Sequence, residues 1–106
     1  MTEKLNALFI FLAPGAVSSE HRTVVDTPGV TLNVVGCVDY DDAETVAVEF
    51  VEEHGVTAVE TCAGFGNEGL AQLSKAVSGK AVVGAVRFDI HPGLGFKSGD
   101  EFFQRT

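Results

Sequence analysis

The sequence predicts an α/β fold: a four-stranded, mainly parallel sheet that carries helices on its faces in the order β-α-β-α-β-α-β. Three observations lead to this prediction. Four apolar runs rich in Val, Phe and Ile are spaced along the chain, and segments with helical periodicity lie between them. The length of 106 residues fits a single three-layer domain that covers residues 1–106.

Each apolar run is expected to form a strand. The runs cover residues 5–13, 30–38, 56–62 and 81–88. They are mostly continuous and do not alternate with polar residues, which is typical of strands that are covered on both faces. Helical segments between strands imply right-handed crossovers, and therefore parallel pairing.

The clearest helix is expected over residues 42–54, where apolar residues recur at helical spacing. Asp41 followed by Glu44 resembles a capping box at its start, and Gly55 is the expected stop. A second helix is expected over residues 67–78, closed by Gly79.

A third and shorter helix is expected early in the chain. Ser18 or Ser19 would cap its N-terminus, and it would continue through Val25 until Pro28-Gly29 stops it.

The charge balance restricts the possible partners. Fifteen acidic residues against seven basic ones give a net charge of −8, which repels nucleic acids and anionic membranes. We therefore expect neither as a partner. The two cysteines, Cys37 and Cys62, are too few for a disulfide scaffold, so a cytoplasmic location is expected.

One alternative concerns the N-terminus, where Lys4 and the apolar residues 7–13 resemble a secretion signal. The run is at the short limit for such a signal, and Phe9, Ile10 and Phe11 are typical of a buried strand. No apolar stretch approaches the roughly 18 residues that span a bilayer.

The C-terminal segment, residues 91–106, is expected to be an irregular tail. It has no periodicity but contains Phe96, Phe102 and Phe103. Large aromatic side chains need burial, either against the same subunit or against a partner. With the sheet edges only partly covered, this predicts a homo-oligomer.

The candidate binding site follows the third apolar run. Gly64, Phe65, Gly66 and Asn67 form a glycine-rich turn that opens a predicted helix. Glycines allow close approach of a ligand, and a helix N-terminus offers unpaired N–H groups to an anion. The sequence therefore predicts binding of a small anionic metabolite at the carboxyl edge of the sheet, with Arg87 as the counter-charge. Alternatively, these glycines only form a tight strand-to-helix turn.

The segment 64–69 also matches the pattern G-x-G-x-x-G, and Asp89 lies twenty residues beyond Gly69. This pattern resembles the dinucleotide-binding fingerprint and would place a ribose hydroxyl on Asp89. The position of the motif after the third strand, with only an irregular tail beyond the next strand, argues against a nicotinamide or flavin. The sequence therefore does not identify a cofactor.

An enzyme at the same edge is the main alternative. Glu60 interrupts an apolar strand, and a carboxylate inside a covered strand must be either paired or protonated. Arg87 is the obvious partner. Glu60 or Asp89 could then act as an acid or base, assisted by His21. A third possibility is a structural oligomer without a ligand.

Two further groups of residues could carry chemistry. Cys37 and Cys62 fall at or near strand ends, where a thiol can be activated, although a buried cysteine is more often inert. His21, Asp89 and His91 could meet in space, but they lack metal-ligand spacing, so no metal site is predicted.

Three blocks of sequence suggest a family. The segments 9–14 (FIFLAP), 62–66 (CAGFG) and 86–89 (VRFD) resemble those of small prokaryotic proteins classed only as a domain of unknown function. The resemblance spans most of residues 5–89 and implies a compact, self-contained protein. It implies no activity, substrate or catalytic residue.

Overall fold

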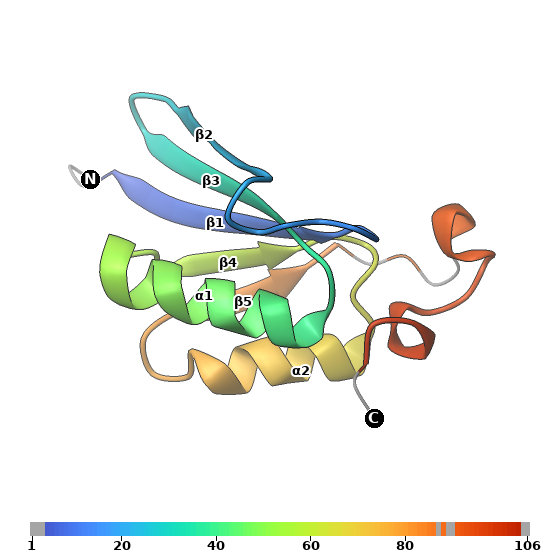
Figure 1. Ribbon diagram of the computed structural model, residues 1–106. Coiled ribbons are helices and arrows are strands. Elements are labelled where there is room, and N and C mark those ends of the chain that lie inside the picture. Colours follow the sequence, from blue (N-terminus) through green and yellow to red (C-terminus); the bar gives the residue numbers. More distant parts are fainter. Residues whose placement is uncertain (1–3, 87, 89–90, 105–106) are drawn as a thin grey trace.

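A computed structural model describes residues 4–86, 88 and 91–104. The described chain forms an α/β fold with one mixed sheet of five strands in the order β2-β3-β1-β4-β5, together with two α-helices and two 3₁₀ turns (Figure 1). The strands are β1 (Leu5–Leu12), β2 (Arg22–Asp26), β3 (Val30–Cys37), β4 (Ala58–Thr61) and β5 (Val82–Ala85). The helical elements are α1 (Tyr40–His54), α2 (Asn67–Ala76), η1 (Pro92–Leu94) and η2 (Gly99–Glu101).

All four predicted strands are confirmed, as β1, β3, β4 and β5. β1 is the central strand and pairs in parallel with β3 on one side and β4 on the other. β4 pairs in parallel with β5. The prediction of a largely parallel sheet is therefore correct, and the carboxyl ends of these four strands lie at one edge.

The predicted helix from Ser18 or Ser19 to Val25 is wrong, because this segment contains β2, which pairs antiparallel with β3. Its β-branched residues favour an extended backbone. Pro28-Gly29 lies in the turn of the resulting hairpin, which Thr27 closes through hydrogen bonds with Val30. The sheet therefore has five strands and not four, and the chain enters β3 from β2 through a hairpin, not from β1 through a helical crossover.

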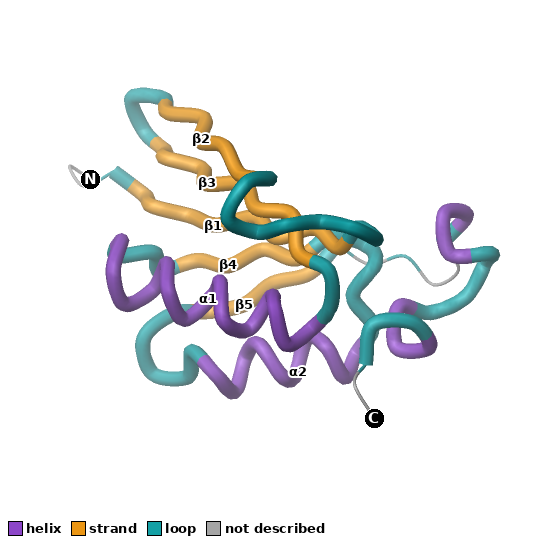
Figure 2. Tube along the Cα trace, viewed as in Figure 1, coloured by secondary structure: helices purple, strands orange, loops and turns teal. Residues whose placement is uncertain are grey.

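The prediction of helices on both faces is also wrong, because α1 and α2 lie on the same face and pack against each other (Figures 1 and 2). The chain moves in the same direction across the sheet from β3 to β4 and from β4 to β5. Two right-handed crossovers in the same direction place both helices on one side. A crossover from β1 to β3 would have run the other way and covered the opposite face, but the hairpin replaces it.

The core lies between the sheet and the two helices. Strand residues that face the helices, such as Leu8, Ile10 and Val35, are fully buried. They pack against apolar residues of α1 and α2, including Val46 and Leu73. The helical spacing predicted for these two helices is therefore correct.

The helix ends differ in detail from the predictions. Asp39 is the N-cap of α1, and its side chain accepts a hydrogen bond from the Asp42 amide at 2.8 Å. Glu44 does not complete a capping box but accepts a hydrogen bond from Gln72 of α2. Gly55 ends α1 in the left-handed conformation, as predicted. Within the described residues, neither helix has the length and apolar content needed to cross a membrane.

Replacing the cap of α1 tests this assignment. Asp39→Ala should lower the free energy of unfolding by about 1 kcal/mol, because the Asp42 amide loses its acceptor. Asp39→Asn, which keeps an acceptor oxygen, should cost only a fraction of that. Urea unfolding followed by circular dichroism measures both. Equal losses in the two variants would contradict the capping role.

Candidate functional site

The glycine loop lies between β4 and α2 at the carboxyl edge of the sheet. Gly64, Phe65 and Gly66 are buried, whereas Asn67 is exposed and begins α2. The Phe65 ring is stacked on the Tyr40 ring, with centroids 5.4 Å apart. The loop is therefore part of the packed interior and is covered by side chains of the same chain.

A carboxylate from the C-terminal tail takes the position expected for a bound anion. Asp100 accepts hydrogen bonds from the Tyr40 hydroxyl at 2.8 Å and from the Glu68 amide, in the first turn of α2, at 3.4 Å. The amide of Gly66 donates to the Tyr40 oxygen at 2.9 Å. Asp100 thus supplies negative charge to the N-terminus of α2 from within the chain.

The glycines of the loop are explained by these contacts. A Cβ on Gly66 would lie 2.0 Å from Asp100 Oδ1, and one on Gly69 would lie 2.3 Å from the Tyr40 ring. Gly99, in the tail, would collide with the Gly64 carbonyl oxygen at 1.5 Å. Close packing of Tyr40 and the tail therefore requires small residues at these positions.

The hydroxyl of Tyr40 is held in its protonated form. Burial, and to a smaller degree the Asp100 carboxylate, raise the pKa of Tyr40 above its ordinary value, and the Gly66 N–H offsets only part of this. The hydroxyl can therefore donate to Asp100 while accepting from Gly66.

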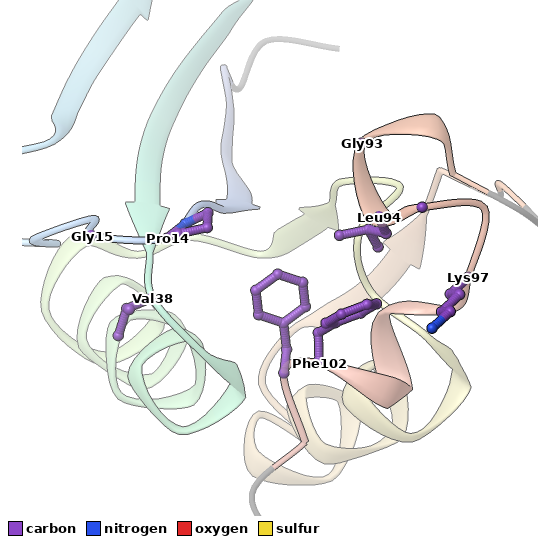
Figure 3. Close-up of a pocket in the computed structure, with 9 residues that line it drawn as sticks. Pro14, Gly15, Val38, Gly93, Leu94, Lys97 and Phe102 are labelled. Carbon is purple, nitrogen blue, oxygen red and sulfur yellow. The ribbon is translucent and has the colours of Figure 1, made fainter.

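An open pocket lies beside the glycine loop, at the same edge of the sheet. It has a volume of about 690 Å³. One wall comes from residues that follow β1 and β3, and the other comes from the tail. Figure 3 shows Pro14 and Val38 facing Leu94 and Phe102 across this space. The described residues that line it are Pro14, Gly15, Val38, Gly93, Leu94, Gly95, Lys97, Phe102 and Phe103.

The pocket is apolar apart from one cation. Among the described residues that line it, Lys97 is the only charged one. It is exposed, and its ammonium lies 6.0 Å from the centre of the Phe102 ring. Among the described residues, no carboxylate forms an ion pair with Lys97. A ligand carboxylate could therefore pair with it.

Other predicted site residues are not brought together. Glu60 is exposed on the sheet face that has no helix, so its expected burial in a covered strand is wrong. His21, just before β2, accepts a hydrogen bond from the Val17 amide at 2.8 Å. β3 and β1 separate β2 from β4, which places His21 and Glu60 about 14 Å apart across the sheet. Arg87 and Asp89 lie outside the described residues.

The cysteines and histidines show no reactive cluster in the described part of the chain. Burial raises the pKa of the Cys37 thiol to about 12, so this thiol is unreactive at neutral pH. Cys62 Sγ accepts hydrogen bonds from the amides of Leu12 and Gly64. No group of three potential metal ligands is found among the described residues.

Sequence reasoning missed Tyr40, Lys97 and Asp100. Tyr40 begins α1, and the two tail residues belong to a segment without periodicity. The available signal was indirect, because glycines such as Gly66 and Gly69 at the start of a predicted helix indicate that another group approaches the backbone closely.

The comparisons with known proteins identify a family but no function. Residues 5–101 match the model of DUF6506, a family of unknown function. The chain belongs to this family. The match extends from the start of β1 to the end of η2, so it includes Tyr40, the glycine loop and Asp100. Neither curated proteins nor solved structures gave a match.

Tyr40 provides a direct test of the packed loop in this DUF6506 chain, since it is the only tyrosine and there is no tryptophan. Its raised pKa means that the folded state resists ionisation, while the unfolded state ionises near pH 10. The contribution of this hydroxyl to the free energy of unfolding should therefore be complete below pH 10. Above pH 10 the free energy of unfolding should fall, by at most about 1.4 kcal/mol per pH unit from this group.

Absorbance of tyrosinate at 295 nm measures the ionisation. The absorbance should rise only together with the loss of the circular dichroism signal. In Tyr40→Phe, the free energy of unfolding should fall less steeply above pH 10. Reversible ionisation near pH 10 in the folded protein would contradict the buried hydrogen-bonded hydroxyl.

Gly66→Ala should release the tail. The new Cβ displaces the Asp100 carboxylate and removes its hydrogen bonds, at a cost of about 1–3 kcal/mol. Limited proteolysis should then cut the segment 91–104 faster than in the parent protein. Gly84→Ala is the matched control, because a Cβ at Gly84 has no neighbour within 4 Å. Equal cleavage rates in both variants would count against the packing described here.

Proposed function

We propose that the chain binds a small molecule with an apolar body and one anionic group, in the pocket at the carboxyl edge of the sheet. The observation that carries this proposal is the open apolar pocket, in which Lys97 is the only charged residue among the described lining residues. A cavity of about 690 Å³ is within the range of small-ligand sites.

The position of the pocket supports the proposal. Ligands of parallel α/β sheets bind outside the carboxyl ends of the strands, where the connecting loops converge. Residues after β1 and β3 form one wall here, and the tail closes the other side. The sequence predicted a site at this same edge, and the present proposal puts the ligand beside the glycine loop and not on it.

The glycine loop has a different role in this proposal. The Gly66 and Glu68 amides donate to Tyr40 and Asp100, so an external anion would first have to displace the tail. The loop instead holds η2 in place, and η2 positions Phe102 and Phe103 in the pocket wall. Direct anion binding at Gly64–Asn67 stays a prediction that requires loss of the Asp100 contacts.

The charge of the protein limits the charge of the ligand. A net charge of −8 repels polyanions, whereas a single carboxylate can be held by Lys97 within a short, weakly screened distance. The apolar lining would supply most of the affinity, and Lys97 would select for the anionic end.

A panel of paired compounds tests the proposal. Hexanoate, octanoate and phenylbutyrate are each compared with the corresponding neutral amide by calorimetry. At least one carboxylate should bind about threefold to tenfold more tightly than its amide, which corresponds to roughly 1 kcal/mol for the pairing with Lys97.

Lys97→Gln should remove this preference while leaving affinity for the amide unchanged. Lys75→Gln, at an exposed position in the last turn of α2, is the control and should behave as the parent protein. The proposal fails if no compound binds or if the preference persists in Lys97→Gln.

A further inference from the structure

The sheet has an apolar face that no described element covers. Side chains alternate between the two faces of a strand, so residues between the helix-facing ones point away from α1 and α2. We call this side the outer face. It includes Leu5, Phe9 and Phe11 of β1, Val25 of β2, Leu32 and Val34 of β3, and Val82 of β5.

These residues form a continuous surface, because the strand register places them side by side. Phe9 is paired with Val34, and Val25 is paired with Leu32. Several remain solvent-exposed, with Val82 at 72% and Val25 at 54%. Monomeric proteins rarely leave a patch of this kind in water.

Charge is distributed very unevenly between the two sides of the molecule. Most of the acidic residues in described elements belong to the helical layer, and α1 alone contains Asp41, Asp42, Glu44, Glu49, Glu52 and Glu53. On the outer face, Glu60 is the only acidic residue contributed by a described strand, and one loop residue, Glu20, lies beside Val34. A chain with a net charge of −8 can approach a second copy of itself most easily through this face.

The dimensions suit such an interface. The five strands contain 29 residues, and only β1 and β3 are eight residues long. At about 3.3 Å per residue and 4.8 Å between strands, the face has a flat area of about 460 Å². Two copies that meet through it would bury on the order of 900 Å² in total, which is close to the lower limit for a specific interface.

We infer that two copies of the chain pack outer face to outer face, as stacked sheets about 10 Å apart related by a twofold axis. When the axis runs along the central strand β1, between the two sheets, the two Glu60 side chains lie on opposite sides of the axis. They therefore do not face each other. Both acidic helical layers then point away from the interface, which minimises repulsion between the copies.

Two neighbouring valines of β2 allow a matched test. Val25 belongs to the outer face, while Val24 points to the helical side, and their exposures are nearly equal at 54% and 53%. In analytical ultracentrifugation, the parent protein should sediment as a dimer. Val25→Glu should raise the dimer dissociation constant at least tenfold, and Val24→Glu should change it less than twofold.

Val34→Glu, nearer the centre of the face, should give monomers, with circular dichroism confirming that the chain remains folded. A parent protein that is monomeric at every concentration would overturn the inference. A dimer that resists both outer-face substitutions would also overturn it. So would a dimer that Val24→Glu weakens as much as Val25→Glu, because a dimer formed by pairing of two β2 edges would respond equally to both substitutions. None of these residues lines the proposed ligand pocket, so the two proposals can fail separately.

Discussion

The hydroxyl of Tyr40 is the contact on which the carboxyl edge of this protein depends. It accepts from the Gly66 amide and donates to Asp100, so one buried oxygen joins the start of α1, the glycine loop and the C-terminal tail. These three segments are distant in sequence. Without the hydroxyl, a buried amide would lose its partner and the tail would lose a strong charge-assisted hydrogen bond. The wall of the pocket formed by Phe102 and Phe103 follows from this arrangement.

The direction of the chain across the sheet determines the second main feature. Both crossovers proceed toward β5, which puts both helices on one face, and the early hairpin leaves the other face without a helix. The molecule therefore has an acidic helical side and an apolar sheet side. This asymmetry results from replacing one crossover by a hairpin.

Much of the fold was predictable because its signals are local. Continuous apolar runs identified β1, β3, β4 and β5, and helical spacing with Gly55 identified α1. The error over residues 18–25 came from giving a possible serine cap more weight than the β-branched residues Thr23, Val24 and Val25. That single error also produced the wrong strand number and the wrong layer arrangement.

The site was less predictable because its parts are distant in sequence. The glycine loop could be located, but the group that approaches it, Asp100, comes from a tail without periodicity. In a sequence, a glycine before a helix looks the same whether the group that approaches it is a ligand or another part of the chain. The premise that Glu60 lies in a covered strand likewise depended on a layer that does not form.

The attachment of Asp100 to the same chain has a consequence for competition. A side chain tethered by a short segment is present at an effective concentration in the millimolar range, without any added ligand. A dilute free carboxylate therefore cannot replace Asp100 at the start of α2 by mass action. Only a molecule that gains additional contacts elsewhere, or a change that lengthens the tether, can compete with it.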